Sequence, residues 1–459
     1  MSNTDYHDGT EPPVEPDEHD DHGDDEFEPV QVFPESEDMD LRQGADQCTK
    51  VGSCDAECPV AEVDDDFPGP QFQGPEQWRL TTGDGEDQFD DSVMSCSNCM
   101  RCDNACPSGV PFSQMHNTAR GRYVSKMGFS LRKLRNRLLA NYRTSAWLAS
   151  KVPRLANLAT NFGPARWLGE KVLGISKERE FPAFATETFR EWWAARGGAE
   201  TSRINAEAAR ERRGLSPDAE KRIAYFHGCY GNYNTPEVAK ALVAVYEELG
   251  YEIVVPEQGC SGTPMFANGF LGDARRHAET NVANLGEAIE EGYDVIASCS
   301  SCSMALRQEY PEQFGIDGIA DLAAHTYDAL EYLRIHEDLE TMLADASVEE
   351  VPDFAYHAPC HSRNQGLARQ SLELFEALDG VEVTDVGDSC SGISGTYGWK
   401  AEKYETSMEI GEEMFEHMEE APAEQGLTEC PTCSMQMEHG TGYDVTHPLE
   451  ILEAALVEV

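Results

Sequence analysis

Basic residues are scarce in this 459-residue chain, which has 35 Lys and Arg against 85 Asp and Glu and a net charge of −50. Proteins neutralise the phosphates of nucleic acid with Lys and Arg, so this balance excludes nucleic acid as a bulk partner. The acidic excess is spread over most of the chain and indicates a solvated coat suited to high salt, where ions screen self-repulsion. Residues 1–40 hold sixteen acids and no Lys or Arg, and we predict that they form a disordered acidic tail.

Long apolar runs are also absent. None reaches the length of a transmembrane helix, and the N-terminus lacks the basic head and apolar stretch of a signal peptide. We therefore expect a cytoplasmic protein whose membrane contact is peripheral or made through a partner. No glycine-rich dinucleotide fingerprint follows a predicted strand, so FAD and NAD are expected to bind elsewhere. No pattern indicates a primary substrate site, so no catalytic residue is predicted.

Cysteine, by contrast, is abundant, with fifteen residues. The run from Cys96 to Pro107 has the spacing C-x2-C-x2-C-x3-C-P, with cysteines at 96, 99, 102 and 106. This run binds iron–sulfur clusters in bacterial-type ferredoxins, where its fourth Cys ligates a second cluster. A four-thiolate zinc knuckle, the other interpretation, usually uses two separated Cys pairs. Chain length and spacing thus favour reduced, metal-bound thiols over a disulfide scaffold.

A second run with the same frame precedes the first, but Val51 stands where its second Cys belongs. Ligands cross over between the runs in two-cluster ferredoxins. Cluster one is therefore predicted to take Cys48, Cys54 and Cys106, and cluster two to take Cys58, Cys96, Cys99 and Cys102. Cluster two has four thiolates and is predicted to be 4Fe–4S. Cluster one has three, because valine cannot ligate iron, so it is either 3Fe–4S or 4Fe–4S with a non-protein fourth ligand.

Residues 120–177 reverse the charge trend, with thirteen Lys and Arg and one acid, Glu170. Apolar residues recur there at roughly helical spacing, and Trp147, Phe162 and Trp167 add aromatic anchors. A basic amphipathic helix with aromatics is typical of a membrane-surface or partner-docking element. The alternative is a helical linker whose basic face neutralises the protein's own acidic surface. The next stretch, to about residue 218, is charged and helix-favouring and is predicted to be a linker.

The second half of the chain contains an internal repeat. The first copy has Cys229, Cys260, Cys299 and Cys302, and the second has Cys360, Cys390, Cys430 and Cys433, with offsets of 131, 130, 131 and 131 residues. Cys260 and Cys390 each begin a Cys-Ser-Gly triplet, and the last two cysteines of each copy form a C-x2-C pair. Chance would not produce four such offsets, so we predict two duplicated domains.

Strands and helices alternate within each copy. We expect strands over residues 222–228, 252–255 and 294–297, and helices over about 235–249 and 271–290, with matching strands at 354–357, at 381–383 and before Cys430. Such alternation implies parallel α/β layers. Each cysteine set then follows the carboxyl end of a strand, where α/β sheets bind ligands, and nearby helix N-termini favour anionic thiolates. Gly262 and Gly392 would supply tight turns close to a cofactor.

Four histidines lie near the repeat cysteines, namely His227, His357, His361 and His447. Each is either a ligand or proton relay, or a hydrogen-bonded structural side chain. The structural role is the expectation for all four.

These residues resemble the cysteine-rich CCG-domain family, found in heterodisulfide reductases and in iron–sulfur subunits of several flavin dehydrogenases. Further stretches are similar to the C-subunit family (the iron–sulfur subunits) of anaerobic glycerol-3-phosphate dehydrogenases: Phe67-Pro68-Gly69-Pro70, His227-Gly228-Cys229, Asn232-Tyr233-Asn234, Ala267-Asn268-Gly269-Phe270, residues 305–311 and Gly395-Thr396-Tyr397-Gly398. The resemblance implies a non-catalytic electron-transfer subunit that passes electrons from a separate FAD subunit to membrane quinone. It also implies a peripheral location on the inner face of the cell membrane, with contact through residues 120–177 as one candidate.

The resemblance divides the chain into five parts. They are an acidic tail (1–40), an α-helical two-cluster ferredoxin domain (41–125), a basic helical segment and linker (126–218), and two α/β CCG domains (219–345 and 346–459), named repeat 1 and repeat 2 below. The fold class expected is thus multidomain, combining α and α/β domains.

One departure from the family concerns Ser261 and Ser391, which stand where its CCG sequence has a second Cys. A five-thiolate noncubane cluster would lack one ligand in each repeat. Four Cys per repeat could hold a 4Fe–4S cube or zinc, and Ser can ligate iron less readily. Alternative functions are an iron–sulfur subunit of glycolate or lactate oxidase, a heterodisulfide-reductase-like enzyme, and a zinc scaffold.

Overall fold

The computed structural model describes residues 47–76, 91–216, 221–346, 348 and 352–457. The disordered tail predicted for residues 1–40 lies outside these ranges. The short helix η2 (Asp91–Met94) precedes Cys96.

The two N-terminal cysteine runs lie on short helices and turns. The further elements are α2 (Ser53–Ala56), α3 (Pro59–Val63), α4 (Gly69–Gln71), η1 (Phe72–Glu76), α6 (Arg101–Ala105) and α7 (Phe112–Lys126). Pro59 starts α3 directly after Cys58, because its fixed φ suits the first position of a helix. The described part of this region contains no strand, which agrees with the predicted α-helical ferredoxin domain.

Four consecutive helices follow, where the sequence predicted one basic amphipathic helix. They are α8 (Leu131–Ala140), α9 (Tyr142–Ser150), α10 (Pro153–Asn161) and α11 (Gly163–Leu173). Ser130 caps α8 by accepting a hydrogen bond from Lys133 N at 3.1 Å. Prolines in the first turns of α10 and α11 divide the segment, because proline tolerates only the start of a helix.

The stretch expected to be a linker contains two helices packed on repeat 1, α12 (Phe189–Ala195) and α13 (Gly198–Arg212). Phe189 and Trp193 of α12 are buried in its core. Ser202 of α13 accepts a hydrogen bond from Ile253 N at 3.1 Å, which gives a backbone N–H of the edge strand Glu252–Val254 a partner. Contacts from both helices therefore tie this stretch to the α/β domain.

Repeat 1 is a parallel sheet covered by helices. Its elements are β1 (Arg222–Phe226), α14 (Tyr230–Tyr233), α15 (Pro236–Glu248), β2 (Glu252–Val254), α16 (Thr263–Asn268), α17 (Leu271–Glu290), β3 (Asp294–Ala297), α18 (Ser300–Met304), η3 (Ala305–Glu309), α19 (Tyr310–Gln313), α20 (Ile319–Ala324), β4 (Thr326–Asp328), α21 (Ala329–His336) and α22 (Leu339–Ala344). The strand order is β2-β1-β3-β4, and Ile223 pairs with Ile253 and Asp294 on either side.

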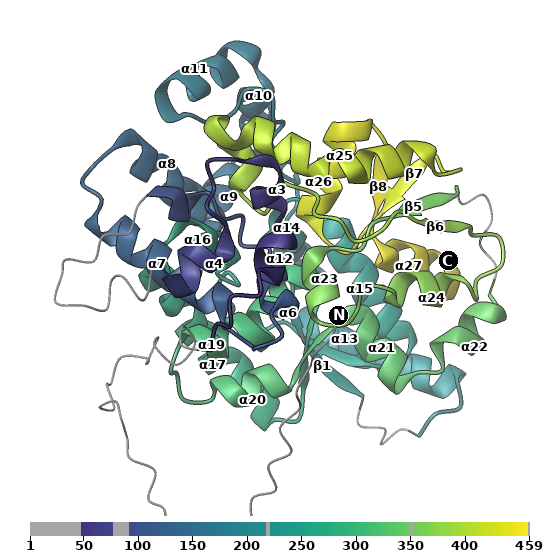
Figure 1. The fold of residues 1–459 in the computed structure, drawn as a ribbon. Coiled ribbons are helices and arrows are strands. Elements are labelled where there is room, and N and C mark those ends of the chain that lie inside the picture. Colours follow the sequence, from purple (N-terminus) through teal and green to yellow (C-terminus); the bar gives the residue numbers. More distant parts are fainter. Residues whose placement is uncertain (1–46, 77–90, 217–220, 347, 349–351, 458–459) are drawn as a thin grey trace, which may run out of the picture. The chain divides into compact units, whose positions relative to one another are not determined.

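Repeat 2 has the same topology, and its strands β5 to β8 lie beside one another in Figure 1. Its elements are β5 (Phe354–Tyr356), α23 (Cys360–Asn364), α24 (Gln370–Phe375), β6 (Val383–Asp385), η4 (Tyr397–Trp399), η5 (Ala401–Lys403), α25 (Tyr404–Glu420), β7 (Gln425–Leu427), α26 (Pro431–Thr441), β8 (Asp444–Thr446) and α27 (Pro448–Leu456). The strand order β6-β5-β7-β8 is again entirely parallel. The predicted duplication of a parallel α/β domain is confirmed.

Three strands differ from the sequence-based expectation. The strand expected at 381–383 is β6, shifted to Val383–Asp385, because Val381 packs into the core beside the turn at Gly380. Strands β4 and β8 were not expected. Each has three residues, and their Thr-Tyr-Asp and Asp-Val-Thr sequences give no long apolar run.

Repeat 1 and repeat 2 share one buried apolar core, which holds them against each other. Leu242 and Tyr246 of α15 belong to the same buried apolar cluster as Leu449 and Leu452 of α27. Burial of a large apolar side chain contributes roughly 1.5–3 kcal/mol, so this continuous packing holds the sheets together.

Candidate iron–sulfur sites

The cluster-two set, Cys58, Cys96, Cys99 and Cys102, is brought together by the loop before α6. Asn98 and Met100 in that loop have left-handed φ of 62° and 64°, which turns the chain between successive cysteines. Burial, followed by the charges of Asp103 and of the other cysteines, raises the pKa of Cys102. Burial, and then Cys96, raises the pKa of Cys58 to about 12. These thiols therefore lie close enough to repel one another as thiolates.

One thiol of the set, Cys96, is electrostatically different. Burial raises the pKa of Cys96, but the guanidinium of Arg120 and then His116 outweigh burial and lower this pKa to about 6. His116 Nδ1 lies 3.7 Å from Cys96 Sγ, and Arg120 Nη2 donates to the Cys96 carbonyl oxygen at 3.2 Å. Both residues are on α7, four positions apart on one face of the helix. The protein thus favours a thiolate at this position.

The cluster-one set, Cys48, Cys54 and Cys106, is also assembled. Burial, then Asp55, then Cys106 and Cys48 raise the pKa of Cys54 to about 12. Cys54 and Cys102 share a buried cluster with Cys48 and Cys106 at its edge. Val51 is 63% exposed, so the position without a protein thiolate faces water.

In repeat 1 the cysteines cluster at the carboxyl ends of the strands, as predicted. A hydrogen bond from the Cys229 thiol lowers the pKa of Cys260. The Cys302 thiol donates to Ser261 Oγ at 3.4 Å, so the serine of Cys-Ser-Gly faces the last cysteine of the repeat. Arg143 of α9 lies near Cys229 and Cys260 and favours their charged forms.

Repeat 2 repeats this arrangement. A hydrogen bond from the Cys390 thiol lowers the pKa of Cys360. Ser391 Oγ lies 3.3 Å from Cys433 Sγ. Gly262 and Gly392 have φ of 88° and 82°, as their predicted turns require, and a Cβ on Gly392 would collide with the Ser407 carbonyl oxygen.

The cysteine sets adjoin one another. Cys58 and Cys390 lie in one buried apolar cluster, with Cys96, Cys99 and Cys360 packed against it. Hydrogen bonds from Cys299 and then Cys433 lower the pKa of Cys430, so the repeats meet at their C-x2-C pairs. A cavity of about 410 Å³ lies between them and is lined by all eight repeat cysteines and by Cys99. Cluster two therefore borders repeat 2, and repeat 2 borders repeat 1.

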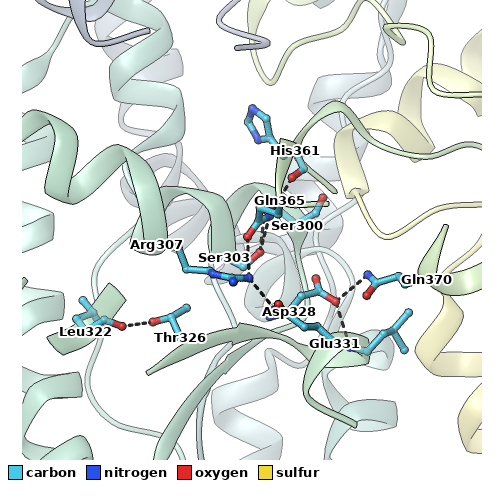
Figure 2. A network of polar contacts seen from close by, with 11 residues as sticks. Ser300, Ser303, Arg307, Leu322, Thr326, Asp328, Glu331, His361, Gln365 and Gln370 are labelled. Carbon is cyan, nitrogen blue, oxygen red and sulfur yellow. Dashed lines mark hydrogen bonds and ion pairs between the residues drawn. The ribbon is translucent and has the colours of Figure 1, made fainter. Parts of the chain in front are cut away.

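A network of polar contacts joins helices of repeat 1 to helices of repeat 2 (Figure 2). Gln365 Nε2 donates to the Ser300 and His361 carbonyl oxygens at 3.1 and 2.9 Å, next to Cys299 and Cys360. Arg307 Nη1 donates to Gln365 Oε1 at 3.3 Å and pairs with Glu331 at 2.7 Å. The network joins the helix that begins at the first cysteine of repeat 2 to the helices of repeat 1.

The network continues to a buried acid, Asp328. It accepts hydrogen bonds from Leu330 N at 3.1 Å and from Gln370 Nε2 at 3.0 Å, and its N–H donates to Glu331. Burial raises the pKa of Asp328 to about 6 against these hydrogen bonds. This carboxyl caps α21 and joins it, through Gln370, to α24 of repeat 2.

The four predicted histidines have different surroundings. His227 Nε2 accepts from Arg190 Nε at 3.0 Å, and His447 Nε2 donates to the Ser298 carbonyl oxygen at 2.9 Å while Nδ1 caps α27. These two are hydrogen-bonded, as expected. In the described part of the chain, neither ring nitrogen of His357 nor Nδ1 of His361 has a hydrogen-bond partner. His361 also lines the cavity between the repeats.

The chemistry of the donors fits iron–sulfur clusters. Across the described residues, no three His, Cys, Asp or Glu side chains meet closely enough to hold one metal ion. The cysteines form larger sets of buried and partly buried thiols, and thiolate is the ligand that such clusters take. Arg120 is fully buried beside Cys96, and none of the described carboxylates forms an ion pair with it. An anionic cluster would supply its missing counter-charge.

Comparison with known proteins agrees with this geometry. The family model described as "4Fe-4S dicluster domain" matches residues 44–110, and the "Cysteine-rich domain" model matches residues 223–307 and 354–438. The anaerobic glycerol-3-phosphate dehydrogenase C-subunit of Escherichia coli (strain K12) is 34% identical over 415 residues, which cover 90% of this chain and 98% of that protein. The chain belongs to this family of anaerobic glycerol-3-phosphate dehydrogenase C-subunits.

Two more distant relatives match parts of the chain. The B-subunit of fumarate reductase (CoM/CoB) of Methanothermobacter marburgensis is 26% identical over 392 residues, covering 79% of this chain and 72% of that protein. Lactate utilization protein A 2 of Bacillus cereus (strain AH820) is 25% identical over 214 residues, covering 44% and 83% respectively. The predicted family, the fold class and the presence of a 4Fe–4S domain are therefore confirmed for this C-subunit family member.

Three arginines near the cysteines were not predicted. Arg120 lies at cluster two, Arg143 at repeat 1, and Arg101 near Cys99 and Cys360, whose charges raise its pKa against burial. The spacing of His116 and Arg120 on α7 is a signal in the sequence. Arg101 and Arg143 reach their sites only through the tertiary fold.

Proposed function

We propose that this chain is the electron-transfer subunit of an anaerobic-type glycerol-3-phosphate dehydrogenase complex. It passes electrons from an FAD subunit to membrane quinone on the inner face of the cell membrane. The observation that carries the proposal is the continuity of the cysteine sets from cluster two through repeat 2 to repeat 1. The Escherichia coli relative, whose name states a glycerol-3-phosphate dehydrogenase, supports the substrate of the complex.

The cysteines are assigned as ligands in four sets. Cluster one takes Cys48, Cys54 and Cys106, and cluster two takes Cys58, Cys96, Cys99 and Cys102; repeat 1 takes Cys229, Cys260, Cys299 and Cys302, and repeat 2 takes Cys360, Cys390, Cys430 and Cys433. Cluster two is 4Fe–4S, and cluster one is 3Fe–4S because Val51 supplies no donor. The repeats hold further iron–sulfur clusters, for which zinc is the alternative. When bound, such clusters accept and release single electrons at potentials set by charge, hydrogen bonding and burial.

The protein's own residues prepare these sites. Cys58 and Cys390 are buried in one apolar cluster at the junction between cluster two and repeat 2. Arg101 and Arg143 place positive charge near the thiols of repeat 2 and repeat 1. Ser261 and Ser391 bring a hydroxyl to the last cysteine of each repeat. Hydrogen bonds to sulfur and nearby charge tune the electron affinity of such sites.

Membrane contact is assigned to the basic segment, residues 120–177. Most of the large exposed apolar side chains among the described residues lie within it: Phe129, Leu131, Leu134, Leu138, Trp147, Leu148, Val152, Leu155, Leu158, Phe162, Trp167, Leu168 and Val172. None of the residues of α10 and α11 is buried. Leu155 and Leu158 are 64% and 67% exposed, which leaves an apolar face uncovered by the described part of the chain.

An anionic lipid surface is the binding partner that this face fits best. The segment's thirteen Lys and Arg and single acid oppose the charge of the remainder of the chain. Basic residues near an anionic bilayer contribute about 1 kcal/mol each, and the exposed Trp and Leu side chains would enter the headgroup boundary. Across the described helices, none is long and apolar enough to cross a membrane. The face is therefore assigned to docking on the bilayer surface.

The docking face is physically connected to repeat 1. Tyr142 of α9 is buried and stacks on Tyr230 with ring centroids 5.2 Å apart, and Tyr230 lines the cavity between the repeats. Arg143 follows on the same helix and donates to the Gly259 carbonyl oxygen at 3.3 Å, one residue before Cys260. A membrane bound to α9–α11 would thus lie near the cysteines of repeat 1, which suits delivery of electrons to quinone.

Anaerobic purification of the native complex tests the proposal. We expect this chain to co-purify with a flavin-containing subunit, to be brown, and to hold iron and sulfide. Washed membranes carrying the complex should reduce a quinone analogue with glycerol 3-phosphate and not with glycolate or lactate. A colourless, zinc-loaded chain would exclude the proposal, and activity with lactate or glycolate alone would assign the chain to another flavin dehydrogenase.

A further inference from the structure

Arg120 is a buried cation whose hydrogen bonds all go to neutral acceptors. Its side chain is 0% exposed. Nη1 donates to Asn98 Oδ1, Asn117 Oδ1 and the Phe266 carbonyl oxygen at 3.2, 3.1 and 2.9 Å, and Nη2 donates to the Cys96 carbonyl oxygen at 3.2 Å. Nε has no partner within the described structure. No described carboxylate forms an ion pair with this guanidinium.

The carboxyl group on the far side of Asn98 is that of Glu309, which accepts from Asn98 Nδ2 at 3.3 Å. Burial raises the pKa of Glu309 to about 8, against the attraction of Arg120. Burial thus favours the neutral form of this carboxyl, and Asn98 lies between it and the guanidinium, so Glu309 forms no ion pair with Arg120.

Burying a charge without a counter-charge costs several kcal/mol, so such an arginine needs an anion nearby. Another buried arginine of this chain meets that need with a carboxylate. Arg135 is 2% exposed and pairs with Glu402 through two contacts of 2.6 and 2.7 Å. Arg120 lies instead beside Cys96 of the cluster-two set, whose carbonyl oxygen it contacts and whose thiolate it favours.

We propose that Arg120 is the fixed counter-charge of the cluster held by Cys58, Cys96, Cys99 and Cys102, and that it raises the reduction potential of this cluster. The inference rests on the ligand set proposed above. Reduction adds one negative charge, and a neighbouring cation in a buried site stabilises the reduced state more than the oxidised state. His116 is a second contact of the same thiolate, and it acts in the same direction through its 3.7 Å contact with Cys96 Sγ.

The placement of Arg120 also keeps its charge at a constant distance from the cysteines. Its bonds to Asn98 and to the Cys96 carbonyl hold the loop that carries two of the ligands. Its bond to the Phe266 carbonyl anchors the same guanidinium to α16 of repeat 1. A Cβ on Gly269 would approach the Arg120 carbonyl oxygen at 2.8 Å, so the two domains are in close contact here. The cation is therefore set between cluster two and the duplicated domains.

A redox titration of the purified full-length chain, followed by electron paramagnetic resonance, tests this role. Arg120→Gln removes the charge and keeps a polar side chain, whereas Arg120→Lys keeps the charge and loses the forked geometry. Arg120→Met fills the space without polar atoms and replaces the glutamine variant should that one not accumulate. Arg210→Gln is the matched control, because Arg210 is also buried and bonds to the Gly250 and Lys221 carbonyl oxygens, away from the cysteines.

We expect Arg120→Gln to lower the ratio of reduced to oxidised cluster two at a fixed potential by about tenfold, which is about 59 mV for a one-electron couple. Arg120→Lys should restore most of this loss, and Arg210→Gln should titrate as the wild type does. Equal shifts in the lysine and glutamine variants would assign Arg120 a purely structural role and overturn the inference. So would an unshifted potential in a glutamine or methionine variant that retains its iron. A wild-type chain without a cluster-two signal would contradict the ligand assignment instead.

Discussion

The hydroxyl oxygen of Ser391 lies 3.3 Å from the sulfur of Cys433. The equivalent contact in repeat 1 joins Ser261 and Cys302 at 3.4 Å. In both copies the serine that replaces a family cysteine therefore faces the last cysteine of its repeat. A hydroxyl there can donate to a thiolate or ligate iron directly, so the substitution retains a polar contact at the site.

Removal of this hydroxyl should weaken iron retention in repeat 2. A hydrogen bond to a charged group contributes about 1.5–3 kcal/mol, so Ser391→Ala should release iron to a chelator at least about tenfold faster. Ser391→Cys should retain iron, because it supplies the family's thiolate. Ser434→Ala is the control, since Ser434 follows Cys433 on α26 and its hydroxyl bonds to exposed Glu438. Equal release rates for all three variants and the wild type would show that Ser391 does not act on a bound cluster.

Val51 offers a separate test at cluster one. Val51→Cys would place a fourth thiolate at the open corner and convert a three-iron centre into a 4Fe–4S cluster. The oxidised variant should lose the resonance of the three-iron centre and gain about one iron per chain. Because Val51 is 63% exposed, the substitution should change the free energy of unfolding by less than about 0.5 kcal/mol. Val51→Ala, the control, should keep the three-iron signal. A wild-type chain that shows no such signal after gentle oxidation would refute the 3Fe–4S assignment.

The docking face predicts a specific lipid dependence. Vesicles of phosphatidylcholine and phosphatidylglycerol should sediment with the chain, and added salt should weaken binding because it screens the basic segment. A triple variant in which Gln replaces Trp147, Leu155 and Trp167 should bind vesicles at least about tenfold more weakly. Burial of a large apolar side chain contributes roughly 1.5–3 kcal/mol, and each replacement loses part of this energy. Ile204→Gln with Ile335→Gln is the matched control, because both are similarly exposed outside the segment.

Two results would discard the lipid assignment. One is unchanged vesicle binding by the triple variant. The other is loss of co-purification with the flavin subunit in the triple variant while vesicle binding persists, which would make the same face a protein-docking surface.

Asp328 predicts a pH dependence of stability. Its folded-state pKa of about 6 lies above the ordinary value of 3.8, because burial disfavours the charged form. Between these values the folded chain binds more protons than the unfolded chain, so this group lowers the free energy of unfolding as pH rises from about 4 to about 6. The cost reaches about 3 kcal/mol and stays constant above about pH 6.

Asp328→Asn removes this titration and keeps the helix cap and the bond from Gln370, since Asn caps helices as well as Asp does. The variant should gain stability relative to the wild type as pH rises across that window, measured by chemical unfolding at each pH. Asp321→Asn, at an exposed position of α20, is the control. A constant difference between Asp328→Asn and wild type from about pH 4 to about pH 7 would contradict the burial argument.

Much of the site could be predicted from the sequence, because the cysteines that bind iron–sulfur clusters follow short, fixed spacings. The runs at Cys48 and Cys96 and the offsets between the repeats identified the cysteines that the fold gathers. Strands β4 and β8 were missed because three largely polar residues carry no periodic signal. Strand β6 was displaced because Val381, although apolar, serves the core before the strand begins.

The remaining features depend on contacts between distant segments. Arg120 meets the Phe266 carbonyl across 146 residues, and no local pattern encodes that meeting. The apolar face of α10 and α11 could not be told from an ordinary linker by periodicity, because both patterns are amphipathic. Its exposure became evident only when the described fold left those side chains without a covering element.

In the function that we propose, electrons from a flavin partner enter the cysteine sets of this chain. The most direct test adds glycerol 3-phosphate to the anaerobic native complex and follows the iron–sulfur signals by electron paramagnetic resonance at low temperature. We expect substrate alone to reduce the clusters of this chain and added quinone to reoxidise them. Iron–sulfur signals that stay oxidised with glycerol 3-phosphate, in a complex whose flavin is fully reduced, would contradict it.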